Sequence, residues 1–289
     1  MTKAPKFSPG TVSKILWHFT GGPRWNDKTQ KQGSRPKPSA DAYRALTSIL
    51  RSRELKLGSY KEIVRAIIPE QRIYDRTSGN LEIKKNVPTQ INSAPVCCLS
   101  DIPAAHLSYH AYRYGKFAIG FHRSAAVRHG FNPVFYSLEH TRVVRSIYNG
   151  FSELEGFDPW GLENAAGEIE FGLTDLEGDV ENTISLALAE IESEVQTIGD
   201  TIHSASKTLR QFLAFVKTFQ EHEFGTIYCE REWRALKTFR FTYDDLAMIV
   251  VPRRVARAEY FEPFVKRVTP KLKLPRSIPI VPWEDLIEH

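Results

Sequence analysis

Two glutamates near the end of the chain have the residue type and spacing of groups that could do chemistry. Glu230 and Glu232 lie in the run YCEREWRALKTF, which has the pattern of a β-strand. Side chains alternate along a strand, so we expect Glu230, Glu232 and Arg234 on one face and Trp233 on the other. Two carboxylates lining a cleft would have separated pKa values, and one could stabilise a developing cation, which makes both candidate catalytic residues. The alternative is an exposed edge strand whose Glu–Arg pairs contribute little.

A histidine near the start of the chain is the second candidate. His18 follows an apolar run in SKILWHFTGG and is separated by two residues from the pair Gly21 and Gly22. On a strand, His18 and Thr20 share one face. The glycines would let a bound group approach the backbone, so His18 and Thr20 are candidate cofactor-binding residues. The alternative is a structural histidine whose hydrogen bonds are satisfied within the fold.

The third candidate region is a strand followed by a tyrosine-rich helix. Ser100 ends the apolar run APVCCLSDIP, and Ser100 or Asp101 can cap the helix that follows. Tyr109 lies in that helix and joins Ser100 in the candidate cofactor-binding set. His106 and His110 are four residues apart, but the glutamate of an H-E-x-x-H zinc motif is missing, so we expect no metal site. The sequence also has no glycine-rich phosphate loop and no G-x-S-x-G motif.

Hydrophobic spacing predicts the elements that must position these residues. Period-3.6 patterns predict helices at residues 39–53, 59–68, 104–115, 140–148 and 258–266, and one or two helices over 180–219 with a break near Gly199. Short apolar runs predict strands at residues 15–20, 94–103, 116–123, 132–137, 226–241, 246–252 and 277–283. Turn-forming residues predict a long mobile loop at 23–39, and residues 71–95 have an irregular pattern.

Strands from both ends of the chain surround a helical middle, which predicts an α+β fold with a mixed β core. We expect one domain in three parts. Residues 1–149 form the N-terminal part of the core, 150–222 an acidic, helical insertion, and 223–289 the C-terminal part. In this arrangement His18 and the pair Glu230 and Glu232 are expected to meet across one shared hollow.

Composition narrows the class of protein. The chain has 289 residues, of which 42% are hydrophobic, enough for one large core. No stretch is apolar enough to cross a bilayer, and MTKAPKFSPG does not have a signal-peptide pattern. Three cysteines exclude a disulfide framework, so we expect a cytoplasmic protein. The net charge of +5 is uneven, with basic flanks at 1–76 and 253–276 and an acidic stretch at 153–200, typical of solvated faces or of a phosphate-attracting surface.

Taken together, these motifs resemble a known family. LWHFTGG, a helix carrying ALTSIL and ELKLGSY, and VCCLSDIPAAHLSYHAYRYGKFAIGFHR with NPVFY look like the first component of the AbiG abortive phage-resistance system. YCEREWR is similar to the end of the same family. The resemblance covers residues 12–136 and 226–252 and leaves the acidic middle unmatched. It implies a bacterial antiviral protein of the toxin–antitoxin type, with a cognate toxin or antitoxin as partner.

More remotely, the order of the motifs is similar to that of ADP-ribosyltransferases, especially those that modify DNA. This resemblance implies an ADP-ribosyltransferase-like core with NAD as substrate: His18 would hold the ribose, Ser100 would sit at the middle motif, and Glu232 would stabilise the ribose cation. Glu230 would orient a nucleic acid or protein acceptor. The usual tyrosine after the middle strand is absent, and Glu54 stands where glycine is common.

Three functions are therefore open at this stage. The first is an NAD-binding protein that transfers ADP-ribose to a macromolecule or hydrolyses NAD. The second is a non-catalytic antitoxin that binds a partner and keeps a degenerate form of the same fold. The third is a nucleic-acid-binding module, which rests only on the basic flanks. None of the three involves a membrane.

Overall fold

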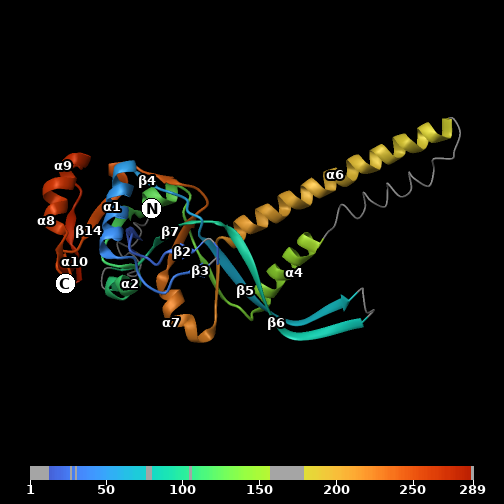
Figure 1. The fold of residues 1–289 in the computed structure, drawn as a ribbon, viewed down its shortest axis with the longest axis horizontal. Helices are drawn as coiled ribbons and strands as arrows, with labels where there is room; N and C mark the ends of the chain where they lie inside the picture. The colour runs from blue at the N-terminus through green and yellow to red at the C-terminus, as the bar shows by residue number, and fades with distance from the viewer. Residues whose placement is uncertain are drawn as a thin grey trace, which may run out of the picture. The chain divides into compact units, whose positions relative to one another are not determined.

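The computed structural model describes residues 13–26, 28–29, 31–75, 80–103, 106–156 and 179–287, and the structural statements below refer to these residues. The chain divides into two compact units, and Figure 1 shows the course of the chain through them. The first unit comprises Met1–Glu62, Pro95–Tyr136 and Ala214–His289, and the second comprises Ile63–Ala94 and Ser137–Leu213. The second unit thus interrupts the first twice. The helical middle expected at 150–222 falls in the second unit as far as Leu213.

A seven-stranded mixed sheet forms the centre of the first unit. Its spatial order is β17–β14–β8–β1–β7–β12–β9, and β14–β17 is a parallel pair while the other pairs with a resolved register are antiparallel. Strands from both ends of the chain lie side by side, which agrees with the predicted α+β class with a mixed core. The strands are β1 (Ile15–Phe19), β7 (Cys97–Ser100), β8 (Ala118–His122), β9 (Asn132–Pro133), β12 (Glu232–Ala235), β14 (Leu246–Val251) and β17 (Ile280–Pro282).

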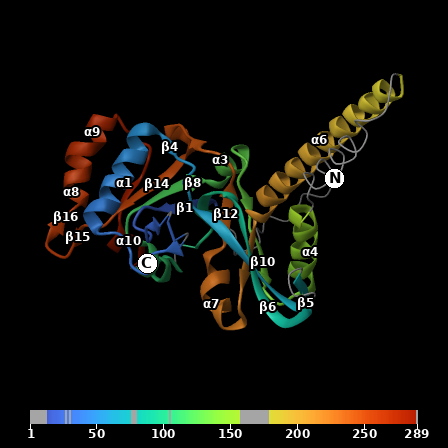
Figure 2. The same cartoon turned by 45° about the vertical axis from the view of Figure 1, so that its right-hand side comes forward.

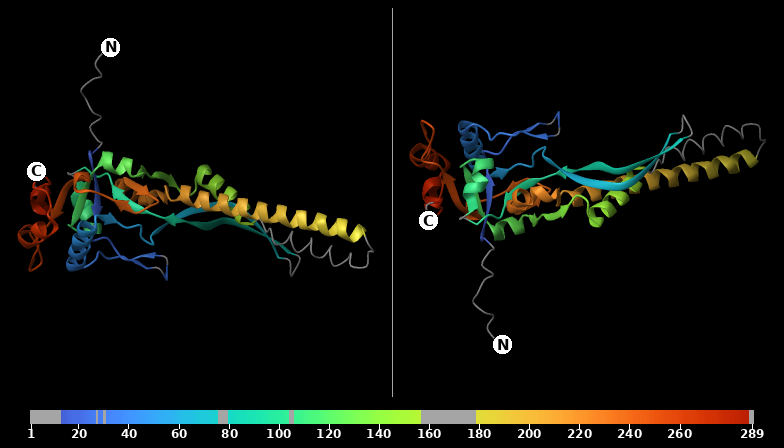
Figure 3. Two further views of the ribbon diagram at one scale, coloured as in Figure 1. Left: turned by 90° about the horizontal axis from the view of Figure 1, so that it is seen from above. Right: turned by 90° about the horizontal axis from the view of Figure 1, so that it is seen from below.

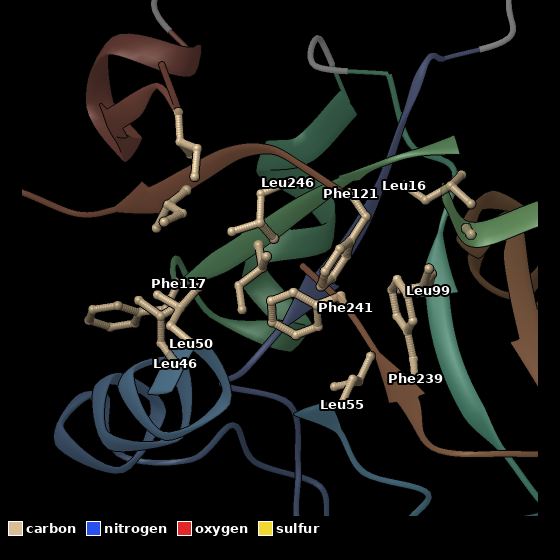
Figure 4. Packing of buried hydrophobic residues seen from close by; sticks show 14 of the residues in the cluster. Leu16, Leu46, Leu50, Leu55, Leu99, Phe117, Phe121, Phe239, Phe241 and Leu246 are labelled. Atoms are coloured by element: carbon tan, nitrogen blue, oxygen red, sulfur yellow. The ribbon is translucent and has the colours of Figure 1, made fainter. Parts of the chain in front are cut away.

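Helix α1 (Ser39–Ser52) packs on one face of this sheet (Figure 2). Its buried residues Ala42, Leu46 and Leu50 recur every four residues, so they form one apolar stripe. Figure 4 shows Leu46 and Leu50 pointing from α1 into the core that Leu16 of β1 also lines. The aromatic residues labelled in this core are Phe117, Phe121, Phe239 and Phe241.

Helices α2 (Leu107–Tyr114) and α10 (Trp283–Ile287) pack on the opposite face. Trp17 and Phe19 of β1 point to this side, where they meet Leu107 and Trp283. The side chains of β1 therefore alternate between two cores, as the sequence predicted. This alternation decides which face each candidate residue shares.

The helices predicted at 39–53 and 104–115 are confirmed over their described residues, as are the strands predicted at 94–103, 116–123 and 246–252. The loop predicted at 23–39 is wrong in part, because residues 25–26 and 31–32 pair as a short hairpin. The helix predicted at 258–266 is only partly correct. Ala258 and Glu259 form a short strand, and the helical residues start at Phe261. The predicted strand at 132–137 is two strands, interrupted at Val134.

Short elements complete the first unit. The two-residue strands are β2 (Trp25–Asn26), β3 (Lys31–Gln32), β4 (Glu54–Leu55), β13 (Phe239–Arg240), β15 (Arg254–Val255) and β16 (Ala258–Glu259). A separate pair is formed by β11 (Val216–Phe219) and β10 (Phe135–Leu138), the strand in which this segment of the first unit ends, at Tyr136. The remaining helical segments are α3 (Arg123–Arg128), α7 (Phe224–Ile227), α8 (Phe261–Pro263), a π-helical turn (Phe264–Val268), α9 (Thr269–Leu272) and 3₁₀ turns at Glu221–Glu223, Tyr228–Glu230 and Tyr243–Asp245.

A long hairpin, β5 (Lys61–Asp75) and β6 (Asn80–Pro95), accounts for most of the first segment of the second unit. The helix predicted at 59–68 is therefore wrong, and so is the irregular stretch at 71–95. Burial alternates with period two through Val64, Ala66 and Ile68, which is a strand pattern. Pro69 does not end the element, because a strand of a two-stranded sheet has an unpaired edge that tolerates a missing N–H.

Two helices form the rest of the second unit, α4 (Arg142–Gly156) and α6 (Asp179–Leu213). Figure 3 shows α6 as one continuous helix, so the predicted break at Gly199 is wrong. A single glycine costs a helix only about 1 kcal/mol, which the rest of a 35-residue helix can offset. The predicted helix at 180–219 also overran, since residues 216–219 form β11. The part of the expected acidic insertion at 157–178 lies outside the described residues.

Candidate functional site

Three neighbouring strands of the sheet carry His18, Ser100 and Glu232. β1 and β12 both pair with β7, and Trp17, Ser100 and Glu232 stand directly opposite one another across the three strands. Residues in register share a face, so Ser100 and Glu232 point to the side covered by α2. His18 is the neighbour of Trp17 on β1 and alternates to the face covered by α1. The sheet thus places His18 and Glu232 on opposite faces, and the expectation that they meet across one hollow is wrong.

The acidic pair is close in space, but for a different reason from the one predicted. Glu232 and Arg234 share a face of β12, as expected, whereas residues 228–230 form a 3₁₀ turn rather than a strand. Arg231 then takes a left-handed conformation with φ 41°, which turns the chain between the two glutamates. The pair is therefore created by a turn and not by strand alternation.

A buried lysine joins the two carboxylates. The ammonium of Lys217, on β11, lies 2.5 Å from Glu230 Oε2 and 3.2 Å from Glu232 Oε2. All three side chains are buried. Glu230 and Glu232 therefore share one cation instead of lining an open cleft.

Helix α2 supplies the remaining partners of Glu230. Arg113 Nη1 lies 2.8 Å from Glu230 Oε1, and the Tyr114 hydroxyl donates to the same oxygen at 2.9 Å. With Lys217 on Oε2, both oxygens of Glu230 are engaged. Arg113 is the most exposed member of this group, with 44% of its side chain accessible.

Arg234 is fully buried and links Glu232 to further partners. Its guanidinium donates to Glu232 Oε2 at 2.7 Å and to Glu62, and it donates to the carbonyl of Ala214 at 2.7 Å. The Tyr60 hydroxyl in turn donates to Glu62 Oε2 at 3.0 Å. Glu62, which no sequence pattern singled out, is therefore part of the same site. We call this set of residues the ion-pair network: Tyr60, Glu62, Arg113, Tyr114, Lys217, Glu230, Glu232 and Arg234.

The formal charges of the ion-pair network cancel, because it contains three carboxylates, two arginines and one lysine. Burial alone would raise the pKa of Glu232, but attraction to Arg234 and Lys217 holds it well below its usual range. Burial alone would lower the pKa of Lys217, and attraction to Glu232 and Glu230 raises it well above its usual value. Glu232 and Lys217 thus remain charged across the physiological range.

Two further groups contact Glu232. The backbone N–H of Glu232 donates to the Tyr136 hydroxyl at 2.7 Å. Cys98, which lies opposite Arg234 in register, hydrogen-bonds to the Glu232 side chain. Burial, reinforced by the nearby Glu232 charge, raises the pKa of the Cys98 thiol well above its usual value, so it stays protonated. A protonated thiol is a weak nucleophile, and Cys98 acts here as a donor.

His18 makes a different kind of contact. Its Nδ1 lies 3.3 Å from the carbonyl oxygen of Cys98, and a carbonyl can only accept, so Nδ1 carries the proton. Burial lowers the pKa of His18 to about 4, with Lys37 adding to the effect, so the ring is neutral. Nε2 is then an acceptor. A ribose hydroxyl bound at this ring would have to donate its proton to Nε2.

The glycine pair beside His18 has a structural explanation. A Cβ on Gly21 would lie 2.7 Å from the carbonyl oxygen of Tyr114 and 3.2 Å from the Cα of Gly115. A Cβ on Gly22 would lie 3.0 Å from the Tyr114 ring. The end of β1 therefore packs against the end of α2. The space that the sequence suggested for a ligand is filled by the protein's own backbone.

The remaining candidate residues are spread over three surroundings. Thr20 is buried and donates to the carbonyl of Ala42 at 2.8 Å, so it ties β1 to α1. Ser100 is half-buried on the face of Glu232. Tyr109 is 56% exposed on α2, one turn before Arg113. Of the candidate residues, the structure brings Glu230, Glu232 and Ser100 together and separates them from His18 and Thr20.

Sequence reasoning missed five charged or hydroxyl members of the ion-pair network, which are Tyr60, Glu62, Arg113, Tyr114 and Lys217. Each lies outside the run 228–239, and in sequence the ion-pair partners are as many as 172 positions apart. Lys217 had a local signal, because it stands inside the apolar run FLAFVKTF. A lysine in a strand core needs a buried carboxylate, and that requirement could have predicted the pairing.

The described part of the chain shows neither a metal-binding cluster nor a membrane-spanning helix. In that part, no group of three or more His, Cys, Asp or Glu side chains is arranged to hold a metal ion. None of its helices combines the length and the apolar character needed to cross a membrane.

Comparisons with known proteins place the chain among phage-defence proteins. A search of solved structures found no match. The chain is similar to a protein of Lactococcus lactis subsp. cremoris, "Abortive phage resistance protein AbiGi", with 33% identity over 89 residues. This similarity covers 29% of the chain and 36% of the relative, so the chain spans little more than a third of that protein's length.

A family model gives the broader match. The family is described as "Putative abortive phage resistance protein AbiGi, antitoxin", and it matches residues 61–284, which is more than half of the chain. The matched range includes the acidic middle, which sequence reasoning had left unmatched, and begins after His18 and Thr20. The chain belongs to the AbiGi family of abortive phage-resistance proteins.

Proposed function

We propose that this protein is the antitoxin-type component of a cytoplasmic abortive-infection pair and that it acts by binding a partner protein. The family description supports the antitoxin role, and the use of only three cysteines supports a reducing compartment. The observation that carries a binding rather than a catalytic role is the ion-pair network around Glu230 and Glu232.

A carboxylate stabilises a reaction cation only if its charge is available to that cation. Glu232 already accepts from Arg234 and lies close to Lys217, and both oxygens of Glu230 have partners. Each buried cation of the ion-pair network is shared by two carboxylates, so releasing either glutamate would leave one positive charge in excess, which is strongly unfavourable in a buried site. The charges of the ion-pair network are mostly buried and are balanced within the protein, which is typical of ion pairs that stabilise a fold. We therefore assign the two glutamates to stability.

ADP-ribosyl transfer on an ADP-ribosyltransferase-like fold is the second candidate. Ser100 and Glu232 stand in register on one face, as that chemistry would need, and this pairing favours it. His18 does not fit, because it lies on the face of the sheet opposite Ser100 and Glu232. The residues present therefore do not form the expected NAD site, and we derive no reaction step from it.

The two candidates are separated by an experiment with the full chain. Purified protein is incubated with NAD while nicotinamide release is measured, and in parallel the protein is co-expressed with its cognate toxin while growth is followed. We expect growth to be restored, the two proteins to co-purify, and no nicotinamide release above a blank. The matched variant is His18→Gln, which removes the imidazole from the face away from the network.

Nicotinamide release that disappears in His18→Gln would establish cleavage of NAD by this protein and overturn the binding proposal. Growth rescue without any complex between the two proteins would also overturn it. Rescue by both wild type and His18→Gln, with a stable complex in each case, is the result that the proposal requires.

A further inference from the structure

One side of helix α6 presents apolar residues at regular intervals. Ile191, Ile198, Ala205 and Phe212 follow one another every seven residues, which is two helical turns, so they form one row. Ile191 is 46% exposed, Ile198 44% and Phe212 54%. Val195, by contrast, lies on an adjacent side of the helix and is buried. A repeating row of half-exposed apolar residues is typical of a helix that packs against another helix.

A groove runs beside this row. It has a volume of about 830 Å³, and its floor and walls include Leu154 of α4 and Leu209 and Phe212 of α6. Small residues make up part of its α6 side, among them Ser204 and Ala205, and they allow another backbone to come close there. The groove residues are Leu154, Thr197, Asp200, Thr201, Ser204, Ala205, Thr208, Leu209 and Phe212. We call this surface the α4–α6 groove.

The charge along the α4–α6 groove is acidic. Two glutamates extend this side of α6 toward its start. Glu190 lies seven residues before Thr197 and Glu194 seven residues before Thr201, so each is on the same side of the helix as the groove residue that follows it. Asp200 lines the groove itself. Glu190, Glu194 and Asp200 are exposed, and the sequence from Leu186 to Ser206 contains no lysine or arginine. An occupant would therefore meet a row of negative charges.

A second copy of the chain is a poor occupant. Its own α6 would bring three more acids, Glu190, Glu194 and Asp200, and the basic residues between 190 and 212 are Lys207 and Arg210. Arg210 is already engaged, since it lies 3.0 Å from Glu155 and donates to the carbonyl of Asn92. Like charges placed along a helix interface are destabilising. The complementary occupant has an apolar stripe flanked by lysine and arginine.

We infer that the α4–α6 groove docks a basic amphipathic helix of the partner protein. This inference rests on the proposed function, because it names the surface through which the antitoxin-type chain binds its partner. The row from Ile191 to Phe212 supplies the apolar contact, and Glu190, Glu194 and Asp200 select for positive charge. Residues 190–212 of a helix span about 34 Å, which matches a partner helix of about three heptads.

The test uses synthetic peptides of about 21 residues and the full chain. One peptide has leucine at the a and d heptad positions and lysine at e and g, a second has glutamate at e and g, and a third is a scrambled form of the first. Binding is followed by fluorescence anisotropy. We expect the lysine peptide to bind, with an affinity that falls as the salt concentration rises, and we expect no binding of the glutamate and scrambled peptides.

Two matched pairs of variants locate the site. Ile198→Ser removes an apolar contact from the row and is expected to weaken binding about tenfold, whereas His203→Ser, on the far side of α6, leaves it unchanged. Glu194→Gln removes a groove charge and is expected to weaken binding about threefold. Glu192→Gln, which removes the same charge from the far side, leaves it unchanged. All four residues are exposed on the helix, and circular dichroism checks that each variant keeps its helix content.

Equal effects within either pair would overturn the proposal, and so would a bound glutamate peptide. A dimer in light scattering that Ile198→Ser dissociates would assign the groove to a second copy instead. Binding and neutralisation of the cognate toxin separate this inference from the proposed function on which it rests. If wild type and Ile198→Ser bind and neutralise the toxin equally, the groove assignment fails while the antitoxin role stands. If wild type does not bind the toxin, the proposed function itself fails.

Discussion

The contribution of a charged side chain to the stability of this protein depends on its ion-pair partners and on its burial. Glu232 and Arg234 are separated by one residue in sequence and meet at 2.7 Å, which a strand produces whether it is exposed or buried. Full burial makes the pair important, because a buried charge that loses its partner destabilises the fold far more than an exposed one. The arginines of this chain therefore differ widely in their contribution to stability.

The first prediction compares a buried arginine with an exposed one. Arg234→Met keeps the side-chain volume but leaves Glu232 and Glu62 without their shared cation, so we expect the free energy of unfolding to fall by about 3–5 kcal/mol. Arg240→Met removes an 81% exposed partner of Glu54 and should change it by less than about 1 kcal/mol. Denaturant unfolding at pH 7 measures both values. Similar values for the two variants would contradict a structural role for the network.

The second prediction concerns pH and His110, which stacks on Tyr114 beside the network. Burial lowers the pKa of His110 from 6.5 to about 4, so the unfolded chain takes up a proton at a higher pH than the folded chain. Stability is therefore lost as the pH falls from about 6.5 to 4, by up to about 3 kcal/mol from this residue. His110→Phe keeps the ring packing and removes the titration. Its unfolding free energy should depend less steeply on pH over this range, and an unchanged slope would rule out a neutral, buried His110.

At the scale of elements, close packing explains features that looked like ligand contacts in the sequence. Gly21 and Gly22 allow the end of β1 to lie against the end of α2. Thr20 ties the same strand to α1 through the carbonyl of Ala42. The run WHFTGG is thus a junction between one strand and two helices. Its residue types are set by space and by hydrogen bonding.

The third prediction contrasts two glycines. Gly21→Ala places a Cβ 2.7 Å from the backbone oxygen of Tyr114, which cannot move without shifting α2, so we expect a loss of roughly 1–3 kcal/mol. Gly150→Ala has open space around its Cβ and lies within α4, where alanine is the better helix former. That variant should gain roughly 0.5–1 kcal/mol. Thermal unfolding gives the sign of the stability change for both variants. An unchanged stability of Gly21→Ala would mean that the junction can accommodate a methyl group.

At the scale of the whole molecule, the chain has two compact units, and it leaves the first unit for the second and returns twice. The ion-pair network belongs to the first unit, and the α4–α6 groove belongs to the second. A core element and a proposed docking surface are therefore built from different contacts. Damage to one need not unfold the other.

The fourth prediction tests this independence by hydrogen exchange in the full chain. Arg234→Met should speed amide exchange in β1, β7 and β12, since these strands carry or adjoin the network. Amides of α6 in the second unit should exchange at the wild-type rate. Exchange that rises equally in α6 would show that the two units unfold together and would limit what a groove variant can report.

The sequence by itself determined the local elements whose pattern is strong. Period-two and period-3.6 spacing located β7, β8, β14 and α1, and local motifs were enough to indicate the family. The pattern misled where packing overrode it, as at Gly199 inside α6 and Pro69 inside β5. Alternation along β1 and β12 was also correct residue by residue. Local backbone geometry fixes all of these features, so a short window of sequence contains them.

Only the tertiary structure decided what the acidic pair does. Glu232 has its charge balanced by Lys217 and Arg234, and Glu230 reaches Arg113 from 117 positions away in sequence. The register of β7 between β1 and β12 put His18 on the other face of the sheet. A one-residue change in register would reverse that result, and this register is reached only when strands that are distant in sequence pair. Charges are balanced by neighbours in space, and the sequence does not specify which residues those will be.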